Sequence, residues 1–505
     1  MHTYRRSFVR WLLAACFSAG ATLFAGPPSD DLAAKSARGK EAMAAGRFDE
    51  AAALYAEIVR ALPSEPGMLL NLGMALSMAG RPREALPPLQ AASKLRPDLF
   101  PASLFLGATH LELGQPAPAV EPLRKVVAAQ PDNLQARQML ADALLSLERF
   151  ESAVPQFRVL SEQAPHSSRA WYGLGRSYEG VARGAFERLQ RSAPDSDYIL
   201  RLVAEAMAVE GKHANAFRLY REALEKRPGL AEVHEALAQI YEQRGHPEWA
   251  AVERERARAI PALDCRSPSL ECDFRAGRYP SVFAAAASLR TAEGLYWLSR
   301  AANELAREAF GRLGQLAPSP EAALLRAEVL RAHRRLLGEA IEELKKATAA
   351  WPKDLRIRRE LANALFLAGD AEAARPILED LLKREPDSSE LALLLGETWL
   401  RALQPAKALP LLERAVHRDP KLLPAQAALG RAYLEAGEPA RAVAPLETAL
   451  PADTDGSLHY QLARAYRATG RADLATQALQ KFQELQRAAE AERQSLQEEF
   501  TITPP

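Results

Sequence analysis

Apolar side chains recur along this chain at helical spacing, and they do so twice between successive prolines. Between Pro63 and Pro97, the first set is Leu69, Leu72, Gly73 and Leu76. Gly80 interrupts the pattern, and the second set is Ala85, Leu89 and Ala92. Steps of three, four and seven residues place side chains on one face of an α-helix. The pattern predicts a hairpin of two helices, with Gly73 and Ala85 small because the helices cross closely.

Prolines delimit these hairpins at a step that is mostly 34 residues. They are Pro63, Pro97, Pro131, Pro165, Pro194, Pro228, Pro318, Pro352, Pro386 and Pro420. A proline inside a helix removes a backbone hydrogen bond and clashes with the preceding turn. The recurring prolines therefore predict turns, and we expect the 35 prolines of the chain to lie between helices. A regular step of this length indicates stacked repeats.

The first-helix pattern Trp171-x-x-Leu174-Gly175-x-x-Tyr178 resembles the tetratricopeptide repeat. Partial versions recur at Leu106-Gly107, Leu140-Ala141, Leu237-Ala238-x-x-Tyr241, Leu361-Ala362, Leu395-Gly396, Leu429-Gly430-x-x-Tyr433 and Leu462-Ala463-x-x-Tyr466. The second helices share an alanine, at Ala51, Ala119, Ala153, Ala216, Ala250, Ala340, Ala374, Ala408, Ala442 and Ala475. The resemblance implies an all-α fold, a right-handed α-solenoid of helical hairpins with a concave inner wall. An unrelated helical bundle is the alternative.

Two segments break the 34-residue period. Pro194 follows Pro165 by only 29 residues, without a turn glycine, and the apolar stripe from Trp171 to Leu189 is uninterrupted. A matching pattern returns 124 residues later and ends at Pro318. We predict one long helix in each of the segments 166–196 and 291–319. A hairpin shortened by five residues is the alternative, because Gly180, Gly184, Gly311 and Gly314 each cost about 1 kcal/mol in a helix interior.

These breaks divide the predicted solenoid into three arrays, residues 31–165, 197–290 and 320–482. Residues 483–505 are predicted to form a capping helix and a tail, because Gln, Glu and Arg predominate there. The repeat is most degraded at residues 262–278, just before the second break.

The first 25 residues have the features of a signal peptide. Arg5, Arg6 and Arg10 precede an apolar run from Trp11 to Ala25, which is short for a membrane span. Both general secretion and the twin-arginine route stay open. Cys16 resembles a lipoprotein cysteine, but the apolar run continues beyond it, so we expect its removal with the signal. The mature chain is predicted to be periplasmic or envelope-associated, without a transmembrane segment.

Removal of Cys16 leaves Cys265 and Cys272. Two nearby cysteines in an exported chain predict one disulfide, which would fasten the segment 262–278. Two thiols without companion ligands do not predict a metal site.

Charge and motifs exclude several classes of function. Lys and Arg number 65 against 64 Asp and Glu, whereas a nucleic-acid binder is normally strongly basic. The nine histidines are scattered, and no H-E-x-x-H, P-loop or G-x-S-x-G motif occurs. We therefore expect no cofactor, no metal and no enzyme activity.

The resemblance places the first helix of each repeat on the inner wall of the groove. Seven candidate residues for partner binding follow: Arg356, Arg359, Asn363, Arg431, Tyr460, Arg464 and Arg467. Guanidinium and amide groups donate paired hydrogen bonds to carboxylates, so acidic segments are the expected ligands. Glu232, Glu235 and Glu242 predict a more acidic wall near Tyr241. Ordinary solvated helix faces are the alternative reading of these charges.

The function that we expect is a scaffold in the cell envelope that binds proteins or peptides in its groove. A component of envelope polysaccharide export or outer-membrane assembly is one alternative. An accessory subunit of an enzyme is another. The sequence leaves the partner and the oligomeric state open.

Overall fold

The computed structural model describes residues 30–267, 269–332, 336–497 and 502–505, and regular structure within these ranges is helical. The expected signal peptide, with Cys16, lies outside the described residues. The first helices are α2 (Asp30–Ala44), α3 (Phe48–Ala61), α4 (Pro66–Met78), α5 (Pro82–Leu95), α6 (Phe100–Glu112), α7 (Pro116–Ala129), α8 (Leu134–Ser146), α9 (Phe150–Gln163) and α10 (Ser168–Ser192).

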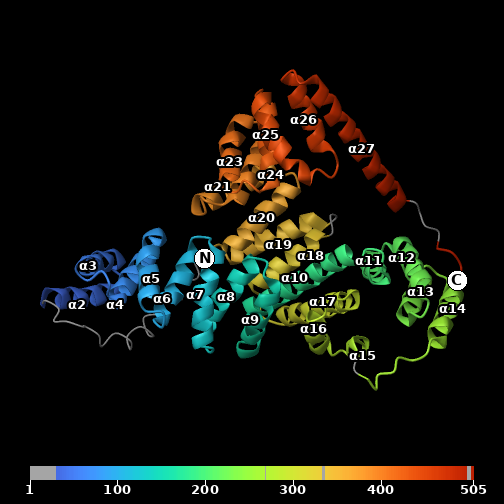
Figure 1. Cartoon of the computed structure of the whole chain (residues 1–505), viewed down its shortest axis with the longest axis horizontal. Coiled ribbons are helices and arrows are strands. Elements are labelled where there is room, and N and C mark those ends of the chain that lie inside the picture. Colours follow the sequence, from blue (N-terminus) through green and yellow to red (C-terminus); the bar gives the residue numbers. More distant parts are fainter. Residues whose placement is uncertain (1–29, 268, 333–335, 498–501) are drawn as a thin grey trace. The chain divides into compact units, whose positions relative to one another are not determined.

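The next helices are α11 (Asp197–Val209), α12 (His213–Lys226), α13 (Ala231–Gln243), α14 (Pro247–Ala259), α15 (Leu270–Arg275), α16 (Tyr279–Ala287) and α17 (Ala292–Gly314). The last are α18 (Pro320–Ala332), α19 (Leu337–Ala350), α20 (Leu355–Leu367), α21 (Ala371–Arg384), α22 (Ser389–Arg401), α23 (Pro405–Arg418), α24 (Leu423–Glu435), α25 (Pro439–Ala449), the 3-10 turn η2 (Leu450–Ala452), α26 (Ser457–Ala468) and α27 (Ala472–Gln497). Consecutive helices pair as hairpins, which confirms the predicted all-α solenoid of repeats (Figure 1).

The hairpin of α4 and α5 shows how the sequence sets the turns. Pro66 and Pro82 begin the two helices, where the missing N–H costs nothing. After α4, Gly80 adopts a φ of 79° and its N–H donates to the carbonyl of Ser77, which ends the helix. The recurring prolines at the 34-residue step lie in the turns between hairpins, as predicted.

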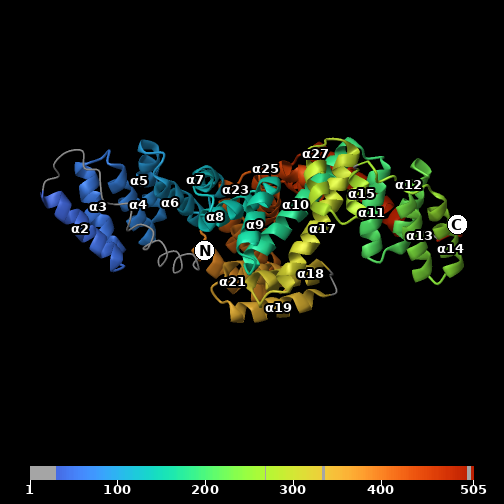
Figure 2. The same ribbon diagram turned by 90° about the horizontal axis from the view of Figure 1, so that it is seen from below.

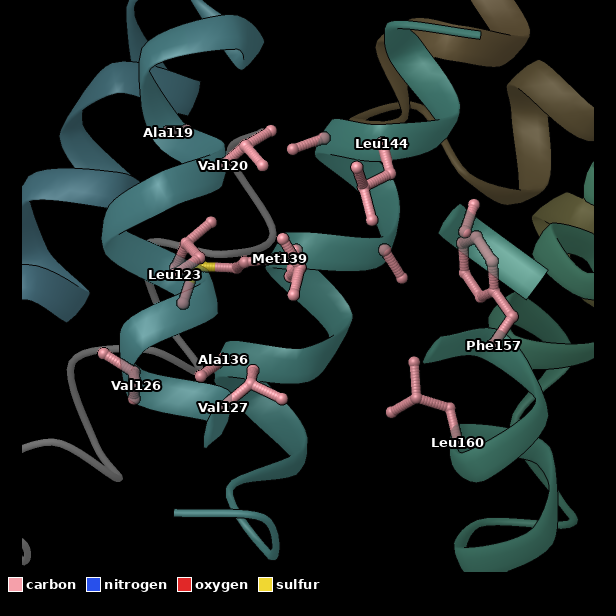
Figure 3. Packing of buried hydrophobic residues seen from close by; sticks show 14 of the residues in the cluster. Ala119, Val120, Leu123, Val126, Val127, Ala136, Met139, Leu144, Phe157 and Leu160 are labelled. Carbon is pink, nitrogen blue, oxygen red and sulfur yellow. The ribbon is translucent and has the colours of Figure 1, made fainter. Parts of the chain in front are cut away.

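The predicted apolar faces form the core. Each of the ten recurring alanines that the sequence placed on the second helices is at most 4% exposed. A Cβ atom built on Gly73 would lie 2.4 Å from Leu89 Cγ, so the small residue is required where α4 and α5 cross. Residues of α7, α8 and α9 interdigitate between neighbouring hairpins, among them Leu123, Met139 and Phe157 (Figure 3). One cluster of buried residues therefore runs continuously from α2 to α10.

The expectation that all prolines lie between helices is wrong. Several second helices contain a proline in their interior: Pro87 and Pro88, Pro122, Pro155, Pro376, Pro410 and Pro445. All of them are exposed or half-buried. On such a face the carbonyl that loses its helical hydrogen bond can bind water, which lowers the cost of the proline.

The two segments that break the period each form one long helix, α10 and α17, rather than a short hairpin. The two helices pack against each other along their length (Figures 1 and 2). Ser299 Oγ donates to the carbonyl of Ala182 across this interface, at 3.1 Å. The sequence indicated neither this pairing nor its hydrogen bond.

The chain divides into two compact units. One comprises the described residues of Met1–Glu205 with Leu219–Ala322, and the other comprises those of Ala206–Arg218 with Ala323–Pro505. The division into three arrays stays a prediction. The last repeat and the expected cap are joined, because α27 continues without a break from Ala472 to Gln497.

Candidate partner-binding site

Three of the seven candidate residues are already paired with carboxylates of the same unit. Arg356 Nη2 lies 2.6 Å from Asp354 Oδ2, at the N-terminus of α20. Arg359 Nη2 lies 2.5 Å from Glu385 Oε2, and an ion pair links Arg431 and Glu397. These pairings leave less of the expected basic wall available to a ligand.

The pKa of Asp354 shows how firmly the first pair is set. Burial raises this pKa, but the hydrogen bond and the charge of Arg356 outweigh burial and leave the pKa below its usual value. Asp354 also accepts a hydrogen bond from the backbone N–H of Arg356, at 2.9 Å. The carboxylate therefore caps α20 and holds the Arg356 guanidinium at the same time.

Arg464 and Arg467 differ from the other candidate arginines. Both side chains are exposed on α26, and neither has a carboxylate partner among the side chains that the structure describes. Asn363 is half-buried on α20. Unpaired positive charge from the predicted set is therefore concentrated on the last repeat.

A pocket of about 310 Å³ lies beside these cations, between α24, α26 and α27. It brings together three of the seven predicted residues: Arg431, Tyr460 and Arg464. The structure does not place Arg356, Arg359, Asn363 or Arg467 in its wall. All three helices belong to one compact unit, in which consecutive helices α26 and α27 pack together (Figure 1).

Side chains of α27 complete the pocket, and the sequence did not predict their contribution. The ring of Phe482 packs on that of Tyr460, with centroids 5.4 Å apart. Gln486 Nε2 donates to the carbonyl of Asp455 at 2.6 Å, which fastens α27 to the loop before α26. In the sequence, Phe482 stands out only as an aromatic residue among polar ones. Its contact with Tyr460 appears only in the folded structure.

The polar groups of the pocket differ in character. Arg431 Nη2 contacts Glu397 Oε1 at 3.0 Å, and Glu435 of α24 adds a negative charge to the wall. The Oε1 atom of Gln461 is buried and has no hydrogen-bond partner in the described part of the chain. The pocket thus offers a free guanidinium and two aromatic rings, and Gln461, one of the residues that line it, has an unpaired side-chain carbonyl.

The charge of the predicted acidic wall of Glu232, Glu235 and Glu242 is partly neutralised, because each carboxylate lies near an arginine. Glu242 Oε1 accepts from Arg254 Nη1 at 2.6 Å, and Glu235 lies 3.9 Å from Arg254 Nε. Glu232 accepts hydrogen bonds from Arg201, from Arg300 Nη1 at 3.1 Å and from the Tyr296 hydroxyl at 3.1 Å. These contacts join α11, α13 and α17.

Burial raises the pKa of Glu232, but the charges of Arg300 and Arg201 and their hydrogen bonds leave it below its usual value. Burial, with the nearby Glu232 carboxylate, raises the pKa of Tyr296. Arg201 also stacks on the Tyr296 ring, 4.2 Å from its centroid. The Glu232 carboxylate is satisfied by these contacts, which hold the three helices together. Arg201 Nε is buried without a hydrogen-bond partner in the described part of the chain. The repeat pattern gave no sign that Arg201 would be buried.

Metal centres and membrane spans are not found within the described ranges. No group of three or more His, Cys, Asp or Glu side chains there could hold a metal ion. None of the helices in this part of the chain combines the length and the apolar character that crossing a membrane requires. Cys265 and Cys272 lie with Cα atoms 5.6 Å apart, a separation that a disulfide spans. The bond itself stays a prediction.

Three family models described as tetratricopeptide repeat match this chain. The first matches residues 110–176, 334–397 and 400–459. The second matches residues 36–98, 70–134 and 180–231. The third matches residues 456–488, which include α26 and part of the pocket. No curated protein matches the chain.

Solved structures of repeat proteins are also similar. A MamA double mutant is 24% identical over 33% of this chain and 96% of its own, with a TM-score of 0.30. A thermophilic TPR protein of Thermus thermophilus is 21% identical over 36% of this chain and 98% of its own, with a TM-score of 0.30. A tetratricopeptide repeat protein from Parabacteroides merdae is 14% identical over 67% of this chain and 100% of its own, with a TM-score of 0.32.

Proposed function

Because the chain belongs to the tetratricopeptide repeat family, we propose that it is a non-catalytic scaffold of the cell envelope that binds acidic segments of partner proteins. Tetratricopeptide repeats mediate protein–protein interaction, and stacked hairpins present an extended concave surface for it. The acidic ligand and the envelope location are the parts of this proposal that need experiment.

The observation that carries the acidic ligand is the state of Arg464. Arg359 and Arg431 already contact Glu385 and Glu397, so binding a ligand carboxylate there would compete with an existing ion pair. Arg464 has no such competitor among the described side chains and lines the pocket. A free guanidinium at the edge of a hollow is well suited to a carboxylate, because it donates paired hydrogen bonds.

Binding of the purified protein to an array of acidic and neutral peptides tests this proposal. Arg464→Ala should weaken binding of acidic peptides about tenfold, the effect of losing about 1.4 kcal/mol. Arg359→Ala is the matched control, since it removes an arginine that Glu385 already occupies. Equal affinity of the wild type and Arg464→Ala for acidic peptides would refute the proposed site.

The envelope location rests on the sequence of residues 1–25 and on the proximity of Cys265 and Cys272. Mass spectrometry of the mature N-terminus from the native host tests it. Cleavage after Ala21 or Ala25 supports export, and an intact Met1 contradicts it. A diacylglyceryl group on Cys16 would show a lipoprotein instead. Co-purification with glycan-export or outer-membrane barrel components would favour those alternatives over a general scaffold.

A further inference from the structure

Most of the surface of the pocket is apolar. Tyr460 is 47% exposed, which is unusual for so large an apolar side chain in this protein. Its ring packs obliquely on Phe482, and Leu434 of α24 lines the same hollow. Exposed aromatic rings in a concave site are the groups that a partner's apolar side chain covers most effectively. A purely acidic segment would leave these rings without a partner.

The distribution of charge also argues against a uniformly acidic ligand. Glu435 lines the pocket from α24 and would repel a carboxylate that entered it. Arg464 and Arg467 lie on α26 instead, on the same helix as Tyr460. Acidic groups of the ligand therefore need to face α26, and the hollow needs to receive an apolar group.

The spacing along α26 fixes a pattern. Tyr460 and Arg464 are four residues apart, and Arg464 and Arg467 are three apart, so each step is about 5–6 Å on the helix surface. In an extended peptide, alternate side chains point to the same side and lie about 7 Å apart. An apolar residue with acidic residues two and four positions away would meet the three contacts in order.

Gln461 supplies a place for the peptide backbone. Its Oε1 is buried and lacks a donor in the described part of the chain, and Gln461 is one of the residues that line the pocket, next to Tyr460 in the sequence. A buried acceptor without a partner costs free energy that a new hydrogen bond recovers. Only the backbone N–H groups of an extended segment offer such donors at every residue.

We propose that this site recognises an extended peptide segment in which an apolar residue alternates with acidic ones, an inference that rests on the proposed function. The apolar side chain enters the hollow between Leu434, Tyr460 and Phe482. The acidic side chains two and four positions away pair with Arg464 and Arg467. The carbonyl of Gln461 accepts a backbone N–H of the same segment.

The test is fluorescence anisotropy of the full mature chain with two labelled peptides of identical composition. In one, glutamates stand two and four positions from a phenylalanine, with serines between. In the other, the glutamates follow the phenylalanine directly. Both chain directions are made. We expect the alternating peptide to bind about tenfold more tightly. Equal affinity of the two would overturn the alternating pattern while leaving the acidic ligand intact; no binding of either would count against both proposals.

Variants locate the contacts. Tyr460→Ala should weaken the alternating peptide about tenfold and leave a phenylalanine-free acidic peptide unchanged. Arg464→Glu should abolish binding of the glutamate peptide and restore binding when lysine replaces the glutamate nearest the phenylalanine. Arg464 is exposed, so this variant should fold normally, which thermal unfolding checks. Failure of the lysine peptide to bind the folded Arg464→Glu variant would contradict the assigned contact.

Discussion

Gly175 of α10 lies against the ring of Phe310 of α17: a Cβ atom built on Gly175 would be 2.3 Å from Phe310 Cε1. Ser299 lies on α17, like Phe310, and also faces α10. Ser299 is 124 residues after Gly175, and Phe310 is 124 residues after Phe186. Ser299 of α17 donates a hydrogen bond to the backbone of α10, at the carbonyl of Ala182. Gly175 of α10 in turn contacts a ring of α17. The two helices thus meet through equivalent positions of a repeated sequence.

Gly175→Ala should destabilise the protein by about 1–3 kcal/mol, because the added methyl group forces the Phe310 ring or the helices apart. Gly184→Ala in the same helix is the control. It meets no atom within 4 Å and should stabilise the protein by about 0.5–1 kcal/mol through its helix preference. Thermal unfolding of both variants distinguishes them. A lower unfolding temperature for Gly184→Ala than for Gly175→Ala would contradict the packing described.

Glu232→Gln should destabilise the protein at neutral pH by about 1.5–3 kcal/mol, since Arg201 and Arg300 lose a charged acceptor. The pKa of Glu232 is lowered in the folded chain, so its contribution is complete above the ordinary value of 4.5 and is lost as pH falls through the lowered value. The unfolding temperatures of wild type and variant should therefore begin to approach each other below about pH 4.5 and meet below the lowered pKa.

Glu235→Gln is the matched control for this measurement. The Glu235 side chain is half exposed and its nearest ion-pair contact, to Arg254, is 3.9 Å. Its replacement should change stability by less than about 0.5 kcal/mol at any pH. A constant difference between wild type and Glu232→Gln from pH 7 to pH 3 would show that the charge of Glu232 is not what stabilises the cluster.

Leu403→Gly should stabilise the protein by about 1 kcal/mol. Leu403 follows α22 with a φ of 56°, in the left-handed region that a side chain disfavours, and it is 82% exposed. Gly437 occupies the corresponding turn after α24, with a φ of 78° and no atom within 4 Å. Gly437→Leu should therefore destabilise by a similar amount. Urea unfolding midpoints measure both; opposite signs to these would disprove the backbone explanation.

Cys265 and Cys272 should resist thiol labelling after the exported protein is denatured without a reductant. Denaturation matters because Cys272 is buried in the folded chain and would be protected in any case. Reduction should then expose both thiols and lower stability by about 2–3 kcal/mol, as the loop-closure estimate gives for a short loop. Two labelled thiols before reduction would rule out the disulfide.

The hairpins were predictable from the sequence because their periodicity follows from local geometry. Ala85, Leu89 and their counterparts repeat at helical spacing, so their burial could be foreseen. The interior prolines could not, because the cost of a proline depends on whether its helix face reaches water. Pro376, for example, is exposed on α21. The apolar pattern shows the helical period, but it does not show which helix faces are exposed to solvent.

The candidate site was predictable only in part. Family resemblance selected Arg431, Tyr460 and Arg464, which the structure brings together. It did not select Gln461 of α26. It did not select Phe482 either, because the contribution of α27 depends on how the last helices fold together. Nor could it separate Arg464 from Arg359, whose partner Glu385 lies 26 residues away. Pairing between distant charges is a property of the fold, and no spacing rule reveals it.

The pairing of α10 and α17 also has a mechanical consequence. In a stack of hairpins each unit touches only its neighbours, so a pull on the chain extends the stack as a spring. Here the chain leaves the end of α10 and returns to the start of α17, a helix that lies along α10. Tension applied to the chain before α10 and after α17 would pass directly from one of these two helices to the other. The repeats between them in the sequence, from α11 to α16, would carry no force until α10 and α17 separate.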